Sequence, residues 1–497
     1  MLESAEIEHS VSKAQYKRAL PDLRDKLLNA QYDLFRSGRG PVIVLLSGVE
    51  GAGRSETANH LTEWMDPRHI RVVAFGEPTG DEASRPLAWR YWQAMPPKGR
   101  LGIFMNGWYT ECLAVHQDSE IGDGALEGRL HAIRRYERML MDEGAVLLKF
   151  WIHLSKAQQK QRLEELDSDP QKTWRVTKRD WKAYRIYNEA HAFWEHLLRE
   201  TSAEAPWVVV PGADEQYRHL TVGRAVLAGL EAAAQASRAR PKKALAARVT
   251  TSAAELPDRT KLIRDLDFRR RLSEAAYSEQ LDLWQGRLAE HTHAKRFRRH
   301  SLVLVFEGVD AAGKGGAIRR VTGALDARQY VTVPVSAPTD EEKAHPYLWR
   351  FWRHVPPLGG IRIFDRSWYG RVLVERVEGF AAPADWMRAY SEINQFEDQL
   401  VQAGTVLVKF WLQVSKEEQL RRFKAREHTS FKRFKITPDD WRNRKKWDDY
   451  ELAVCEMVER TSTEIASWTL VEADDKRYAR IKVLQTIVER LDRALAR

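Results

Sequence analysis

The chain has 497 residues, of which 43% are hydrophobic and 30% are charged, a balance typical of a globular protein with two or three domains. It holds no apolar run of about 18 residues, and its first twenty residues lack a signal core, so we expect a cytoplasmic protein without a membrane span. The two cysteines, Cys112 and Cys455, are too few for a disulfide framework or a thiolate metal site. The net charge of +10 favours anionic partners and leaves nucleic acid, nucleotides, a membrane surface and inorganic polyphosphate open.

An internal repeat organises the chain, because residues of the first half match residues 260 positions later. The segment PVIVLLSGVEGAGRSE at 41–56 matches SLVLVFEGVDAAGKGG at 301–316. Further along, AVLLKFWIHLSK at 145–156 matches TVLVKFWLQVSK at 405–416. The register holds until it shifts by one position near Trp207. This pattern predicts a tandem duplication.

The duplication predicts the domain boundaries. Residues 1–235 form the first copy and residues 259–497 the second. Between them, residues 236–258 are rich in Ala, Ser, Lys and Arg and lack a sustained apolar stripe, so we interpret this segment as a linker.

Each copy alternates short apolar runs with helical patterns. In the second copy, strands are expected at 302–306, 361–364 and 406–412, and a helix is expected from near Gly316. Nearly continuous apolar strands that alternate with helices are typical of a parallel sheet covered on both faces. Each copy is therefore predicted to be a three-layer α/β domain.

Two matching motifs predict the start of a further helix in each copy. Ser415 with Glu418 three residues later has the form of a capping box, and Ser155 with Gln158 repeats it.

A phosphate-binding loop is predicted at 308–316, GVDAAGKGG, which matches the Walker A pattern G-x-x-x-x-G-K between a strand and a helix. Glycines allow successive N–H groups to point inward, the helix N-terminus adds positive potential, and Lys314 brings a mobile charge. The alternative is an ordinary glycine-rich turn. The remaining predicted phosphate-binding residues of the loop are Gly308, Ala311, Ala312, Gly313, Gly315 and Gly316.

The metal ligands expected near this loop are carboxylates. A Ser or Thr normally follows the loop lysine and binds Mg²⁺, but Gly315 and Gly316 follow it here. Asp310, inside the loop, and Asp365, at the end of the apolar run 361–364, are the oxygen donors that we predict instead. A role in a turn or a helix cap is the alternative for each.

Two arginines follow Asp365 at the edge of the predicted sheet where ligands bind in open α/β folds. Arg366 and Arg371 can each donate two hydrogen bonds to phosphate oxygens, and we predict that they bind phosphate. Ordinary surface charge is the alternative.

A strongly basic segment, 421–446, is predicted to form a lid over a polyanionic substrate, and its counterpart at 161–186 is less basic. A solvated helix face is the alternative. The candidate phosphate ligands in this segment are Arg422, Arg426, Lys432, Arg433 and Lys435.

The first copy has changed at the positions to which chemistry is assigned. Arg54 stands where the second copy has Lys314, and Met105 stands where it has Asp365. The aromatic pair Trp108-Tyr109 is kept, as core packing would require. We therefore expect the first copy to be inactive and structural. The other exchanged pairs are Asp310 with Glu50, Gly315 with Ser55, Gly316 with Glu56, and Arg366 with Asn106.

Several separated motifs of the second copy, GVDAAGKGG, PTDEEKAHPYLWRFW, IFDRSWYGRVLVERVEGF, SKEEQLRRF and ADDKRYAR, resemble the second family of polyphosphate kinases. The resemblance implies a thymidylate-kinase-like fold, dependence on Mg²⁺ or Mn²⁺, inorganic polyphosphate and AMP or ADP as partners, and no nucleic acid or membrane partner. It leaves a homo-oligomer open. It also implies catalytic roles for Asp310, Lys314, Asp365 and Arg366, with the two aspartates binding the metal.

Three functions remain as hypotheses from the sequence. The first is transfer of a phosphoryl group from polyphosphate to AMP, which the two-domain architecture favours by analogy. The second is an ATP-dependent kinase of the same fold, because the loop alone does not distinguish a triphosphate from a longer chain. The third is a non-enzymatic protein that binds polyanions or nucleic acid, although no known nucleic-acid module is present.

Overall fold

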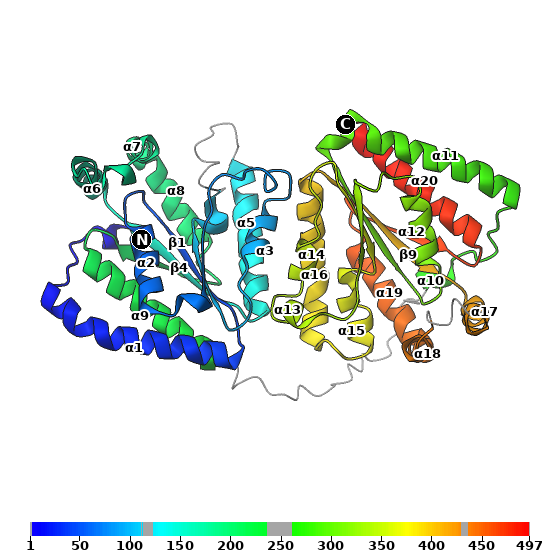
Figure 1. Ribbon diagram of the computed structural model, residues 1–497, viewed down its shortest axis with the longest axis horizontal. Coiled ribbons are helices and arrows are strands. Elements are labelled where there is room, and N and C mark those ends of the chain that lie inside the picture. Colours follow the sequence, from blue (N-terminus) through cyan, green and yellow to red (C-terminus); the bar gives the residue numbers. More distant parts are fainter. Residues whose placement is uncertain (1, 111, 113–122, 236–260, 429–435, 497) are drawn as a thin grey trace. The chain divides into compact units, whose positions relative to one another are not determined.

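The structure is a computed structural model that describes residues 2–110, 112, 123–235, 261–428 and 436–496 (Figure 1). The chain forms two compact units, one of residues 1–78, 90–243 and 338–349, and one of residues 79–89, 244–337 and 350–497. The predicted linker, 236–258, lies outside the described residues.

The N-terminal half contains a five-stranded parallel sheet in the order β2-β3-β1-β4-β5. Its strands are β1 (Val42–Gly48), β2 (Ile70–Ala74), β3 (Leu101–Met105), β4 (Val146–His153) and β5 (Trp207–Pro211). Its helices are η1 (Glu3–Ala5), α1 (Lys13–Ser37), α2 (Arg54–Trp64), η2 (Pro67–His69), α3 (Ala88–Ala94), η3 (Gly107–Tyr109), α5 (Asp123–Asp142), α6 (Lys156–Ser168), η4 (Thr173–Arg175), α7 (Lys178–Arg185), α8 (Tyr187–Glu200) and α9 (Glu215–Gln235).

The C-terminal half repeats this sheet in the order β10-β9-β6-β8-β7, again parallel throughout. Its strands are β6 (Ser301–Gly308), β7 (Tyr330–Pro334), β8 (Ile361–Asp365), β9 (Thr405–Gln413) and β10 (Trp468–Glu472). Its helices are α10 (Lys261–Arg264), α11 (Glu274–His293), η6 (Lys295–Arg299), α12 (Lys314–Thr322), α13 (Asp340–Lys343), α14 (Trp349–Trp352), η7 (Trp368–Arg371), α15 (Val374–Val377), α16 (Pro383–Gln402), α17 (Lys416–Glu427), α18 (Pro438–Lys445), α19 (Trp447–Thr461) and α20 (Lys476–Leu495).

Helices cover both faces of each sheet, which confirms the predicted three-layer α/β class. In the C-terminal half, α11, α12 and α20 lie on one face and α14, α16 and α19 on the other (Figure 1). The central strand β6 is buried along almost its whole length, which explains its continuous apolar sequence. The carboxyl ends of β6, β8 and β9 meet at one edge, and this edge carries the predicted phosphate loop.

The three strands expected in the second copy are confirmed, and two more are present. The edge strands β7 and β10 were missed because they are short and partly exposed, so their sequences contain no continuous apolar run. The helix expected from near Gly316 begins two residues earlier, at Lys314.

The two predicted capping boxes differ. At Ser155 both reciprocal hydrogen bonds with Gln158 form. At Ser415 only the bond from the Glu418 N–H to the serine hydroxyl forms, because the Ser415 N–H donates to Asp474 instead and the Glu418 carboxylate pairs with two arginines of α17. The predicted helix start at Ser415 is confirmed, because α17 begins at Lys416, but the reciprocal bond of the predicted capping box is absent.

A buried ion pair lies at the same place in each half. Lys409 Nζ is 2.7 Å from Glu397 Oε2 and donates to the carbonyl of Thr461, and Tyr369 donates to the same glutamate. Lys149 makes the same 2.7 Å contact with Glu137. A buried pair needs such complete hydrogen bonding to offset the loss of hydration. Both copies have therefore kept the same buried Lys–Glu pair.

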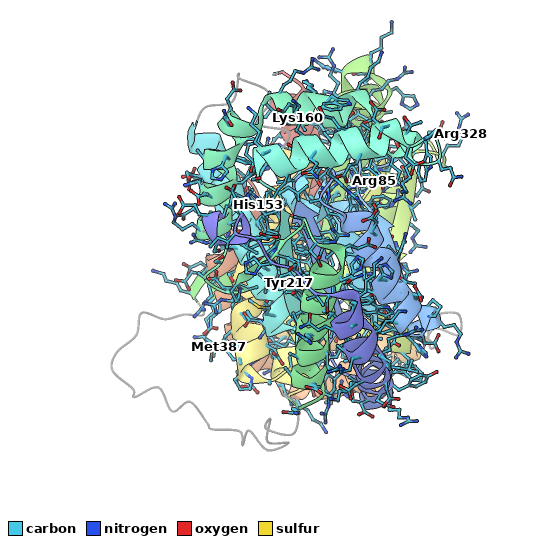
Figure 2. All side chains as sticks on the ribbon, turned by 90° about the vertical axis from the view of Figure 1, so that its left-hand side faces the viewer. Arg85, His153, Lys160, Tyr217, Arg328 and Met387 are labelled. Carbon is cyan, nitrogen blue, oxygen red and sulfur yellow. The ribbon has the colours of Figure 1, made fainter. Side chains whose placement is uncertain are left out.

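Figure 2 labels Lys160 on α6 and Arg328, whose side chains are exposed, and His153, which is buried. Among the described residues, every helix is too short or too polar to cross a bilayer.

Candidate active site

The loop between β6 and α12 has the backbone that a phosphate loop requires. Gly308 has a φ of 149° and Gly313 a φ of 110°, both in the region that favours glycine. A Cβ atom at Gly308 would also collide with the carbonyl oxygen of Leu412 on β9. The loop leads directly into the N-terminus of α12, where backbone N–H groups and the helix dipole favour an anion.

Lys314, the first residue of α12, reaches back over this loop. Its Nζ donates to the carbonyl of Gly308 at 2.7 Å. Removal from water lowers the pKa of Lys314, and the neighbouring Arg366 charge lowers it further, whereas Asp310, Asp365 and Glu307 oppose the shift. Lys314 therefore lies near both carboxylates and an arginine. A site that binds phosphate together with a metal ion needs groups of both charges.

Asp310 and Arg366 contact each other across the loop. Arg366 Nη2 lies 3.3 Å from Asp310 Oδ1, and Asn443 on α18 donates to the other carboxylate oxygen at 2.8 Å. Arg366 has a φ of 65°, which is costly for a residue with a side chain and directs the arginine toward the loop. Sequence reasoning missed Asn443.

Two further carboxylates lie near Lys314. Asp365 lines the groove, and its side chain makes no hydrogen bond or ion pair with the other described residues. Glu307, which sequence reasoning missed, is 5% exposed and accepts a hydrogen bond from Ser367 Oγ at 2.8 Å. Burial raises the pKa of Glu307, and the charge of Lys314 opposes that shift. Oxygen donors of this kind are the ligands that Mg²⁺ prefers, so the residues present fit such an ion.

Arg422 does not take the position in a lid that the basic segment suggested. It is 5% exposed, and it donates to the carbonyls of Ala311 and Ala312 at 2.9 and 3.0 Å and to that of Ala473 at 2.7 Å. Its Nε pairs with Glu418 at 2.6 Å. The structure therefore places Arg422 beneath the loop, where it holds the backbone in place.

A basic groove extends from the loop and encloses about 1710 Å³, part of it open to solvent. Of the predicted residues, it brings together Asp310, Ala311, Ala312, Gly313, Lys314, Gly315, Gly316, Asp365, Arg366, Arg422 and Arg426. Sequence reasoning missed its other cationic residues, which are Arg319, Arg421, Lys476 and Arg480.

A second pocket, whose space of about 760 Å³ includes open solvent, adjoins the groove and shares Asp310 and Arg366 with it. Three aromatic side chains, Trp411, Trp447 and Tyr450, line this pocket, together with Gly308 and Asn443. Sequence reasoning missed this aromatic pocket because its side chains come from β9 and α19.

The remaining predicted residues lie elsewhere. Arg371 pairs with Glu375 at 2.8 Å and lines neither the groove nor the aromatic pocket. Lys432, Arg433 and Lys435 lie outside the described residues.

Side chains at the corresponding loop of the N-terminal half pair with one another. Arg54 pairs with Glu50 and Asn106. The Glu56 carboxylate, in the first turn of α2, accepts hydrogen bonds from three arginines: Arg162 at 3.1 Å, Arg175 at 2.9 Å and Arg218 at 2.9 Å.

Comparison with known proteins identifies the family of this chain. The sequence model of polyphosphate kinase 2 matches residues 10–238 and 271–497, so it matches each half separately. The chain belongs to the polyphosphate kinase 2 family. A crystal structure described as a polyphosphate kinase 2 of Pseudomonas aeruginosa covers the whole chain with a TM-score of 0.89 and 53% identity.

Curated family members match over similar lengths. A polyphosphate:AMP phosphotransferase of Pseudomonas aeruginosa is 54% identical over 99% of both chains. One of Acinetobacter johnsonii is 36% identical over 94% of both chains. A GDP-polyphosphate phosphotransferase of Mycobacterium tuberculosis is 39% identical over 46% of this chain and 77% of its own length. The expected family is confirmed.

Proposed function

We propose that this chain transfers the terminal phosphoryl group of inorganic polyphosphate to AMP and that its C-terminal half carries out the transfer. The observation that carries the proposal is the meeting of two unlike pockets, the basic groove and the aromatic pocket, at Asp310 and Arg366. The relatives that match almost the whole chain are named polyphosphate:AMP phosphotransferases, which supports this choice of substrates.

The basic groove suits the donor. Polyphosphate carries a negative charge on every unit, and the groove presents Lys314, Arg426, Lys476 and Arg480 beside the N-terminus of α12. Its volume exceeds that of a single phosphate group many times over. We infer that the chain end lies at the loop and that the preceding units follow the cationic side chains.

The aromatic pocket suits the acceptor. The faces of Trp411, Trp447 and Tyr450 can pack against a purine ring, and the amides of Gln413 and Asn443 supply polar contacts. The phosphate of AMP would then point toward Asp310 and Arg366, where the groove begins.

The reaction needs positioning and charge neutralisation more than covalent catalysis. An oxygen of the AMP phosphate attacks the terminal phosphorus in line, the bond to the bridging oxygen breaks, and the shortened chain leaves with the electron pair. Lys314 and Arg366 lie where they can stabilise the charge on the transferring group. A Mg²⁺ or Mn²⁺ ion held by Asp365 with Asp310 or Glu307 would neutralise further phosphate charge.

The deciding test is a donor assay. Purified protein with Mg²⁺, AMP and polyphosphate, but no ATP, is expected to form ADP while the polyphosphate shortens. Formation of ADP only after ATP is added would instead support an ATP-dependent kinase. If neither donor is consumed and nucleic acid binds tightly, the protein is a binding protein and the proposal fails.

A further inference from the structure

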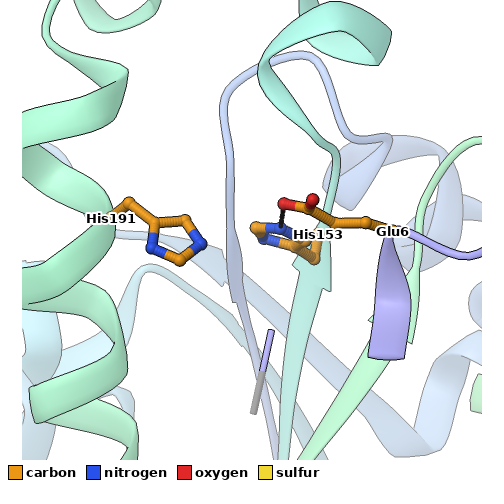
Figure 3. A group of neighbouring side chains, drawn as sticks. All are labelled: Glu6, His153 and His191. Atoms are coloured by element: carbon orange, nitrogen blue, oxygen red, sulfur yellow. Dashed lines mark hydrogen bonds and ion pairs between the residues drawn. The ribbon is translucent and has the colours of Figure 1, made fainter. Parts of the chain in front are cut away.

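Three side chains with metal-binding groups converge in the N-terminal half, outside its vestigial phosphate loop. Glu6 follows η1, His153 ends β4 and His191 lies in α8. One ligand atom from each lies within 4.8 Å of the other two. Figure 3 shows the three side chains reaching toward a common point from separate elements. This spacing lets one ion contact all three after small side-chain rotations.

The contact between Glu6 and His153 already has the separation that a metal site needs. His153 Nε2 lies 3.0 Å from Glu6 Oε1. Bonds of about 2.0 Å in a tetrahedral zinc site place neighbouring ligand atoms roughly 3.3 Å apart. The His153 ring is fully buried, and its Nδ1 has no hydrogen-bond partner among the described residues. In the contact with Glu6, Nε2 donates to the carboxylate and the lone pair of the neutral ring is on Nδ1, so binding an ion through Nε2 requires the tautomer that carries its proton on Nδ1.

The hydroxyl of Tyr187 lies beside two members of this cluster. Its hydroxyl donates to the carbonyl of Leu154 at 2.8 Å and lies 3.4 Å from both Glu6 Oε1 and His153 Nε2. A hydroxyl oriented in this way can support the ligands of an ion, as outer hydrogen bonds commonly do in metal sites.

Among the described residues, the other copy has no equivalent of this cluster. The repeat places Gln413 opposite His153 and Glu451 opposite His191, and both of these residues line the aromatic pocket. Gln413 accepts a hydrogen bond from Trp411 Nε1 at 2.7 Å. Glu6 lies before residue 10, where the match to the family begins. The N-terminal half therefore has two imidazoles at positions whose counterparts line the aromatic pocket of the C-terminal half, and the Glu6 carboxylate lies beside them.

We propose that Glu6, His153 and His191 bind one transition-metal dication, with Zn²⁺ as the best fit. Imidazole and carboxylate together suit Zn²⁺, whereas Mg²⁺ prefers sites made of oxygen alone. The residues just before Glu6 are already packed into the domain, since Leu2 and Ala5 are buried. The ion fastens this segment to the sheet and to α8, so it stabilises the N-terminal half without taking part in phosphoryl transfer.

The test measures Zn²⁺ binding to the full chain after removal of metals with a chelator. Calorimetric titration is done in excess Mg²⁺, which fills oxygen-rich sites first. We expect one equivalent of Zn²⁺ to bind and to raise the unfolding temperature. His191→Ala and His153→Gln should each weaken binding by about 100-fold or more and abolish the thermal shift. The second variant installs the residue that the other copy uses, so that folding is retained.

Two controls make the test specific. His196→Ala removes a more exposed imidazole from the same helix, α8, and should bind Zn²⁺ as the wild type does. His60→Ala alters a second group, formed by His60, Glu215 and His219, and should also leave the tight site intact. The proposal is overturned if the wild type binds no Zn²⁺, if both ligand variants bind it normally, or if His60→Ala removes the tight site.

Discussion

The two phosphate loops of this chain share a backbone and differ in what lies over it. Gly48 and Gly308 both have positive φ values, as do Gly53 and Gly313. In the C-terminal half, glycines at 315 and 316 leave the helix N-terminus open to the basic groove. In the N-terminal half, Glu56 in the first turn of α2 has a carboxylate held by three arginines, Arg162, Arg175 and Arg218.

If transfer takes place only in the C-terminal half, as we propose, the N-terminal loop has changed its side chains while keeping a positive surrounding. A carboxylate at a helix N-terminus, surrounded by guanidinium groups, has the same favourable interactions that a phosphate would have. We therefore expect the N-terminal loop to favour an anion still, with Glu56 of the chain itself in that role. The buried Lys–Glu pairs, identical in both halves, show that the scaffold did not change with the site.

The largest expected effect is the difference between two alanine variants, one at the loop lysine Lys314 and one at the matching Arg54. Lys314→Ala should lower kcat on the order of 1000-fold, because it removes the charge nearest the transferred group. Arg54→Ala should keep activity within about twofold, since Arg54 already pairs with Glu50 and Asn106. Steady-state ADP formation measures both. Equal losses would contradict the assignment of the chemistry to one half.

A smaller effect is expected from the strand-end carboxylate. Asp365→Asn keeps the size of the side chain but removes its charge, so kcat should fall by about 100-fold and the Mg²⁺ concentration for half-maximal rate should rise. Met105→Leu changes the matching position of the other half and should alter neither. An unchanged Mg²⁺ dependence in Asp365→Asn would remove Asp365 from the metal site.

A substitution in the aromatic pocket should change the KM for AMP more than the KM for polyphosphate. Trp447→Leu should raise the KM for AMP by roughly tenfold, because stacking on a base contributes about 1–3 kcal/mol. The KM for polyphosphate should stay the same. Tyr187→Leu, at the matching position of the N-terminal half, serves as the control. A rise in the polyphosphate KM instead would place the donor in this pocket and reverse the proposed arrangement.

The sequence predicted the features that depend on neighbouring residues. The strand, loop and helix around Lys314 follow from an apolar run, spaced glycines and a helical pattern within about twenty residues. Arg422 shows the limit of such reasoning. Arg421 and Arg422 are adjacent in a basic run, yet the Arg421 side chain is 70% exposed and that of Arg422 is 5% exposed, because successive residues of a helix point about 100° apart.

The missed site residues come from distant elements, and the order of the strands brings them together. Asn443, Lys476 and Glu307 belong to α18, α20 and β6, and local patterns do not reveal that they approach one loop. The repeat nevertheless contained a signal for each. The first copy has Ala183, Glu215 and Ser47 at these positions, so extending the comparison beyond the motifs would have found them.

The smallest effect expected is a gain of binding in the N-terminal half. Glu56→Gly removes the internal carboxylate and leaves three arginines around an open helix N-terminus, so inorganic triphosphate should bind there weakly. The Lys314→Ala background removes turnover, and calorimetry then counts the sites. Glu56→Gln serves as the control, because it removes the charge but still fills the space, and it should bind less triphosphate than the glycine variant. If Glu56→Gly binds no more triphosphate than its parent, the arginine cluster is only a structural ion-pair network.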